Sequence, residues 1–70
     1  MKETREFTRL KNEQQFREYF ENYFLGWKEM VIINGIRFFA TYDDDINLII
    51  ENEYEKFKFN NIDEAIETFY

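Results

Sequence analysis

The stretch MVIINGIRFFATY, residues 30–42, decides the fold. Two runs of β-branched and aromatic residues flank Asn34-Gly35, a pattern that predicts a β-hairpin. Asn and Gly both tolerate positive φ, so a two-residue type I′ turn fits at this pair without strain. The turn sets the register of the two strands and predicts three facing pairs: Ile33 with Ile36, Val31 with Phe38, and Met30 with Phe39.

A helix is predicted before the hairpin. Asn12 and Gln15 have the spacing of a capping box. Aromatic residues then recur at intervals of three and four, which is typical of an amphipathic helix. We interpret this stripe as core, and its members are Phe16, Tyr19, Phe20, Tyr23 and Phe24. Gly26 is placed to end the helix as a left-handed cap, with Trp27 folding back on the last turn.

Two more strands are predicted after the hairpin. A loop made of Asp43, Asp44 and Asp45 predicts four facing pairs: Tyr42 with Ile46, Ala40 with Leu48, Phe38 with Ile50, and Arg37 with Glu51 as an ion pair. A turn at Asn52-Glu53 then predicts Leu48 opposite Phe57 and Ile46 opposite Phe59. Because hydrophobic alternation agrees with the charge pairing, the two signals support one register.

The last segment, residues 60–70, predicts a second helix. Asn61 and Glu64 form a capping box, and Asp63 and Glu64 suit the positive end of the helix dipole. The predicted buried stripe of this helix is Ile62, Ala65, Ile66 and Phe69.

These elements predict a single α+β domain over residues 1–70, with a two-layer architecture. A four-stranded antiparallel sheet carries two helices on one face, in the order αββββα. Residues 1–11 form a flexible or short-strand lead-in. The other face of the sheet keeps an apolar centre among charged side chains, and a face of this kind often marks an interface. The residues of that centre are Met30, Ile32, Phe39 and Ile49.

The composition argues against catalysis and against binding of a metal or cofactor. The 70 residues contain no His and no Cys, so the common general base and the thiol nucleophile are absent. Gly26 and Gly35 are the only glycines, and no nucleotide-binding loop or catalytic serine motif occurs. Asp43, Asp44 and Asp45 lack the alternating spacing and the Gly of a calcium loop. We therefore expect no enzyme activity, no metal and no cofactor.

The N-terminal sequence MKETREFTRL lacks the apolar segment of a signal peptide, and no apolar run reaches the roughly 20 residues that span a bilayer. Without Cys, nothing implies an oxidising compartment. We therefore expect a cytoplasmic protein with no membrane contact.

Charge is unevenly distributed along the chain. The net charge is −6, and residues 42–70 carry nine acidic residues against Lys56 and Lys58. This half is expected to repel nucleic acid, because phosphate contacts supply most of the affinity for nucleic acid. The acids can instead form a surface that attracts a basic partner. The candidate partner-binding residues are Asp43, Asp44, Asp45, Glu51, Glu53 and Glu55.

In size, acidity, lack of Cys and aromatic richness, the chain resembles small inhibitor proteins of phages and mobile elements, of the anti-CRISPR and anti-restriction type. The resemblance implies a non-enzymatic protein in the host cytoplasm. Such a protein would act as a DNA mimic, blocking a defence complex by occupying its basic nucleic-acid-binding groove.

Two alternatives stay open. One is a structural or regulatory homodimer through Met30, Ile32, Phe39 and Ile49. The other is a single-stranded nucleic-acid binder, in which Phe39 and Tyr54 stack on bases while nearby basic residues contact the backbone. Those basic residues are Arg37, Lys56 and Lys58.

Overall fold

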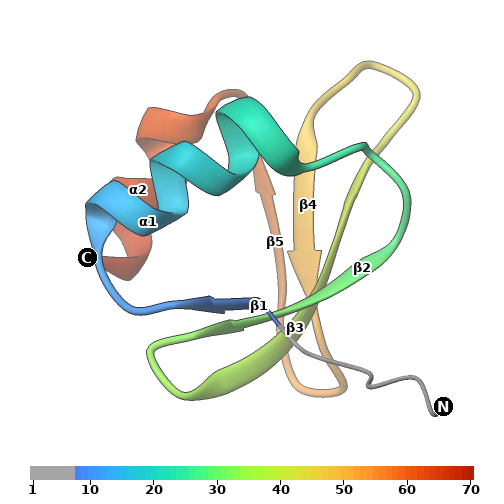
Figure 1. The fold of residues 1–70 in the computed structure, drawn as a ribbon. Helices are drawn as coiled ribbons and strands as arrows, with labels where there is room; N and C mark the ends of the chain where they lie inside the picture. The colour runs from blue at the N-terminus through green and yellow to red at the C-terminus, as the bar shows by residue number, and fades with distance from the viewer. Residues whose placement is uncertain (1–7) are drawn as a thin grey trace, which may run out of the picture.

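A five-stranded sheet with the order β1-β2-β3-β4-β5 forms one layer of the computed structural model, which describes residues 8–70 (Figure 1). Helices form the second layer, on one face of the sheet. The strands are β1 (Thr8–Leu10), β2 (Glu29–Ile33), β3 (Ile36–Tyr42), β4 (Leu48–Glu51) and β5 (Lys56–Phe59). The helical segments are α1 (Glu13–Glu18), the π-helix η1 (Tyr19–Tyr23) and α2 (Ile62–Phe69). The α+β class is therefore as predicted.

The sheet differs from the predicted four antiparallel strands, because β1 adds a fifth strand that pairs parallel to β2. A parallel pair needs a crossover connection rather than a tight turn, and here α1 and η1 provide it. Strand β1 has only three residues and no adjoining turn, so its sequence shows almost no alternation of polar and apolar residues from which a strand could be predicted. Part of the predicted lead-in is thus a strand, and residues 1–7 lie outside the described range.

The hairpin of β2 and β3 is confirmed in register, with Ile33 opposite Ile36, Val31 opposite Phe38 and Met30 opposite Phe39. Asn34 and Gly35 have φ values of 53° and 83°, as a type I′ turn requires. The Asn34 side chain also donates a hydrogen bond from Nδ2 to the carbonyl of Phe69, at 2.6 Å. The turn is therefore tied to the end of α2.

The predicted pairing of β3 with β4 is wrong by two residues. Tyr42 faces Leu48 and Phe39 faces Glu51, so Arg37 is not opposite Glu51. The cause is Asp43, whose Oδ1 accepts hydrogen bonds from the backbone N–H groups of Asp45 and Asn47, both at 2.9 Å. An Asp whose side chain accepts these N–H groups occupies the last strand position before the turn, so it is not itself a loop residue. The three-residue loop therefore covers residues 44–46.

The same error occurs between β4 and β5, where Leu48 faces Phe59 instead of Phe57. Asn52 Oδ1 accepts the N–H groups of Tyr54 and Glu55, at 2.8 and 2.9 Å. The turn is consequently centred on residues 53–54, one position later than predicted. Ile46, predicted to face Phe59, lies in the preceding loop.

The two register errors do not change which strand residues face the core, because a shift of two residues leaves every side chain on the same face of the sheet. Strand residues pack against both helices in one cluster, formed by Leu10, Phe16, Phe20, Val31, Ile33, Phe38, Ala40, Leu48, Ile50, Phe59, Ala65 and Ile66. Ile36 and Ile46, predicted to face this core, are instead 49% and 72% exposed.

Both helix N-termini are capped as predicted. Asn12 Oδ1 accepts the N–H of Gln15, and Asn61 Oδ1 accepts that of Glu64, each at 2.9 Å. At the C-terminus, Tyr70 donates its hydroxyl to the Leu10 carbonyl at 2.8 Å, which joins the end of the chain to β1. Across residues 8–70, no helix has the length and apolar character to traverse a bilayer.

Replacing Gly35 by Val is expected to lower the free energy of unfolding by about 1–2 kcal/mol, because a β-branched residue is strained at positive φ. A Cβ at this position would meet no atom within 4 Å, so the loss isolates backbone strain. Urea denaturation measures it. Gly35→Asn is the matched control and should lose far less. Equal stability of the Val variant and the parent would contradict the turn.

Replacing Ile46 by Asn is expected to raise the free energy of unfolding by about 1 kcal/mol. Ile46 has φ 62°, a left-handed conformation that Asn tolerates and a β-branched side chain does not. Thermal and urea unfolding of the two proteins measure the gain. Ile46→Val keeps the branched Cβ and should give no gain, so stabilisation by Val would point to a different cause.

Candidate binding surfaces

The six predicted partner-binding acids do not form one surface. Asp43, Asp44 and Asp45 lie at the β3–β4 end of the sheet, whereas Glu53 and Glu55 lie in the β4–β5 turn at the opposite end (Figure 1). Four-residue β4 separates the two groups by about 13 Å. Glu51 lies between them on the sheet, opposite Lys56. Two separate acidic loops result.

Asp43 has a structural role. Besides its two backbone hydrogen bonds, its Oδ2 accepts one from Asn47 Nδ2 at 3.3 Å and lies 3.9 Å from Lys58 Nζ. The pKa of Asp43 is lowered from its ordinary value, chiefly by the backbone hydrogen bond from Asn47, with the Lys58 charge contributing least. Its carboxylate therefore holds the loop closed and is only partly available to a partner.

The open face of the sheet, opposite the helices, carries three cross-strand rows of side chains. The registers give these rows as Arg9, Ile32 and Arg37; Met30, Phe39, Glu51 and Lys56; and Thr41, Ile49 and Lys58. The four residues of the alternative dimer face thus share this surface. Ile49 is buried, and the other three are half-buried. The centre of the open face is apolar and its margins are charged.

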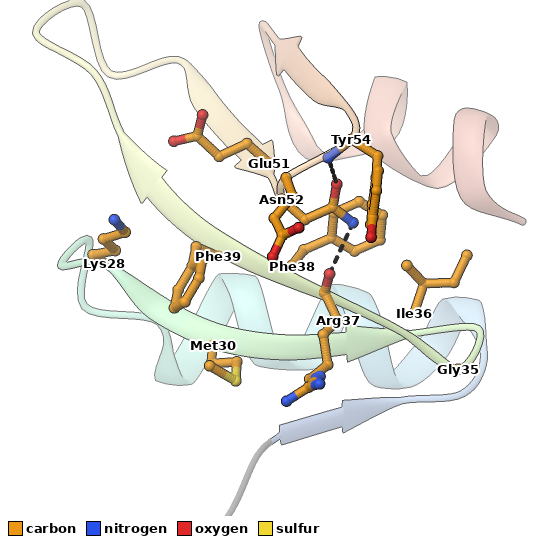
Figure 2. Close-up of a pocket in the computed structure, with 11 residues that line it drawn as sticks. Lys28, Met30, Gly35, Ile36, Arg37, Phe38, Phe39, Glu51, Asn52 and Tyr54 are labelled. Carbon is orange, nitrogen blue, oxygen red and sulfur yellow. Dashed lines mark hydrogen bonds between the residues drawn. The ribbon is translucent and has the colours of Figure 1, made fainter.

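A groove of about 800 Å³ runs along β3. On this face it is lined by Met30, Arg37, Phe39 and Glu51, and beyond the end of β4 it reaches Ile36 and Phe38 of the other face. Figure 2 shows Lys28, Met30 and Phe39 at one end of the groove and Ile36 and Tyr54 toward the other. Lys28 Nζ lies 4.9 Å from the centre of the Phe39 ring, a cation–π contact that places this amine over the apolar floor.

The wall of the groove exists because β4 is shorter than β3. Pairing stops at Glu51, so the Arg37 carbonyl has no strand partner and instead accepts a hydrogen bond from Asn52 Nδ2 at 3.0 Å (Figure 2). This bond draws the β4–β5 turn against β3, and Tyr54, 85% exposed, projects beside the groove.

Charge is separated by face. Around the open face and its groove, five basic side chains accompany three carboxylates, Glu51, Asp43 and Glu53; the basic residues are Arg9, Lys28, Arg37, Lys56 and Lys58. Elsewhere in the described range only Lys11 and Arg17 are basic. The acids there are Glu13, Glu18, Glu21, Glu29, Asp44, Asp45, Glu55, Asp63, Glu64 and Glu67. A basic face therefore belongs to an otherwise strongly acidic protein.

A second surface consists of Tyr23, Leu25 and Trp27, which we call the Trp27 surface. These large apolar side chains are 63%, 75% and 73% exposed, within five consecutive residues. The sequence predictions missed it, because Tyr23 was assigned to the core and Trp27 was expected to pack on the helix. Both assignments are wrong. Exposed aromatic residues are over-represented among those that dominate protein interfaces.

The π-helix explains this exposure. Phe24 donates its N–H to the Tyr19 carbonyl at 2.8 Å, a bond that spans five residues instead of four. The extra residue turns Tyr23 outward while the Phe24 ring packs 5.0 Å from that of Tyr42. Gly26 has a positive φ as predicted but lies in the loop beyond the helix end, beside the Tyr42 ring.

Glu29 fixes the other side of this loop. Its carboxylate accepts a hydrogen bond from the Leu25 N–H at 3.3 Å and another from the Tyr19 hydroxyl. Burial, followed by this hydrogen bond, raises the pKa of Tyr19 well above its ordinary value, so the hydroxyl stays protonated. The loop that presents Leu25 and Trp27 is thus held at both ends.

No family model, curated protein or solved structure matches this chain. Within residues 8–70, no three carboxylates come close enough together to hold a metal ion. The surfaces themselves are therefore the evidence for function.

Replacing Asp43 by Asn should lower the midpoint of urea unfolding at pH 7. Because folding lowers the Asp43 pKa, the carboxylate stabilises the protein above its unfolded pKa of about 3.9 and loses this effect as the pH falls through the folded value. The difference between variant and parent should therefore shrink below about pH 4. Asp44→Asn, at an exposed neighbour, is the control, and a difference that persists in acid would contradict this role.

Proposed function

We propose that this chain is a non-enzymatic inhibitor that binds another protein through the Trp27 surface. The observation that carries the proposal is the exposure of Tyr23, Leu25 and Trp27 on a backbone built to present them. Exposing such apolar side chains to water is unfavourable. Burying each of them against a partner lowers the free energy by about 1.5–3 kcal/mol. Three of them suit the centre of an interface, where aromatic residues fill pockets on the partner.

Acidic side chains supply the long-range attraction in this proposal. Thr41 Oγ1 donates a hydrogen bond to the Gly26 carbonyl at 3.3 Å, so the Trp27 loop runs beside the end of β3 that leads into Asp44 and Asp45. Glu21 lies two residues before Tyr23. A partner with a basic rim around an apolar pocket would be attracted by these charges and held by the aromatic residues.

A basic rim of that kind is typical of proteins that bind DNA or RNA. The partner we propose is therefore a nucleic-acid-binding protein of a host defence complex, whose groove the chain would occupy. The small size, the acidity and the lack of His and Cys support an inhibitor of the anti-CRISPR or anti-restriction type, encoded by a phage or mobile element and acting in the cytoplasm.

The test compares tagged parent chain with Trp27→Ala by capture from host lysate and quantitative mass spectrometry. A partner should be retained by the parent and reduced about tenfold or more by the variant, as for a residue that anchors an interface. Two further variants neutralise Asp44, Asp45, Glu53 and Glu55 in pairs, as Asn or Gln. Of these four acids only Asp44 and Asp45 lie beside the Trp27 loop. The variant restricted to Asp44→Asn and Asp45→Asn should therefore lose the partner most at low salt, where screening is weakest, whereas Glu53→Gln with Glu55→Gln should retain it. Both variants leave the structural Asp43 intact.

Tyr54→Ala is the matched control, because Tyr54 is at least as exposed but belongs to the β4–β5 turn, which lies at the opposite end of the sheet (Figure 1). It should retain the partner. Equal losses from Trp27→Ala and Tyr54→Ala would contradict a specific Trp27 surface. If the captured partner binds its DNA or RNA as well with the chain as without it, inhibition is wrong.

A further inference from the structure

We infer that the open face of the sheet is a second docking site, which takes an acidic amphipathic helix from another protein. This inference is independent of the proposed function, since it concerns the opposite sign of charge and a separate surface. It rests on the unpaired basic residues, on the apolar rows between them and on the size of the face.

Four of the five basic residues of the open face lack the close carboxylates that Arg17 has; the fifth, Lys58, lies 3.9 Å from Asp43. Arg17, on α1, lies within 4 Å of three carboxylates: Glu13, Glu21 and Asp63. In contrast, no carboxylate among residues 8–70 is that close to Arg9, Lys28, Arg37 or Lys56. Among the described residues, four cations on one face therefore have no carboxylate within 4 Å, and an anionic partner can pair with them.

The apolar rows between these cations decide which anion fits. Ile32 lies between Arg9 and Arg37, and Met30 lies beside Phe39 in the next row. Aliphatic side chains offer bases little to stack on, whereas recognition of single strands depends on exposed aromatic rings. Phe39 already has Lys28 over its ring. A protein segment with its own apolar stripe fits this centre better than nucleic acid does.

The dimensions favour one helix. Five strands about 4.8 Å apart, with 3 to 7 residues each and so roughly 10–23 Å long, offer a footprint of roughly 350 Å², well below the ~800 Å² per partner of a standard protein interface. A helix is about 10 Å wide and fits within this face. It would cover the sheet as α1 and α2 cover the other side, giving a third layer.

A second copy of this chain is a poor occupant. A two-fold dimer through the open faces would bring both sets of unpaired cations together, and like charges oppose that contact. The exposed sides of α1 and α2 are acidic, but their apolar residues are already in the core. The alternative homodimer is therefore less favoured than a separate acidic helix.

The probe is a synthetic 18-residue peptide with a helical stripe of Leu and Phe flanked by Glu, titrated against the ¹⁵N-labelled full chain by NMR. Its partner probe replaces every Glu by Lys, which keeps the stripe and the helix propensity. The Glu peptide should bind at least tenfold more tightly. Its shifts should centre on Met30, Ile32 and Phe39, and its affinity should fall as salt is added.

Arg37→Gln and Arg17→Gln are the matched variants, because each removes one arginine charge from opposite sides of the protein. Arg37→Gln should weaken the Glu peptide about fivefold, and Lys56→Gln should weaken it similarly. Arg17→Gln and Trp27→Ala should leave it unchanged, so failure here is separate from failure of the proposed function.

Four results would overturn the inference. They are absence of binding by the Glu peptide, equal affinity of the Lys peptide, tighter binding of an 18-nucleotide oligo-dT strand, and dimerisation in sedimentation equilibrium that Phe39→Glu abolishes. The third would assign the open face to single-stranded nucleic acid, and the fourth to a second copy of the chain.

Discussion

The left-handed backbone at Asn34 and Gly35 is the constraint on which the rest of the structure depends. With two residues in the turn, Val31 must face Phe38, and both point under the helices. A slip of one residue would turn Arg37 into the core and expose the apolar residues beside it. The Asn34 side chain also bonds the last turn of α2, so the residue that forms the turn helps to hold a helix against the sheet.

The sequence predicts the fold best where a local pattern is compatible with only one low-energy backbone conformation. Asn34-Gly35 and the Asn caps of both helices are of this kind. The two later turns were placed one residue early because Asp43 and Asn52 were counted as loop residues, although their side chains close the loops from the last paired position. For β1 a short strand was one of two options, but its pairing with β2 was not predicted, since its partner is distant in the chain and three residues carry little periodicity.

The candidate surfaces were harder to predict than the fold. Summed along the chain, residues 42–70 are acidic, and this sum predicts that they repel an anionic partner. In a strand, however, neighbouring residues face opposite ways, so Lys56 and Lys58 join Arg9 and Arg37 on the open face while the acids of the loops lie at the ends of the sheet. Charge by segment and charge by face are therefore different quantities, and only the second determines what a surface attracts.

The Trp27 surface shows the same limit within a helix. The spacing of Tyr19, Tyr23 and Phe24 assumes a constant 3.6 residues per turn, but one hydrogen bond that spans five residues rotates everything after it. A regular helix would have kept Tyr23 in the aromatic stripe. The π-turn gives up that burial while keeping Phe24 against Tyr42, and π-turns of this kind are frequent at functional sites. The local departure from regular packing thus coincides with three exposed large apolar residues close together in sequence, and the binding role that we propose would account for both.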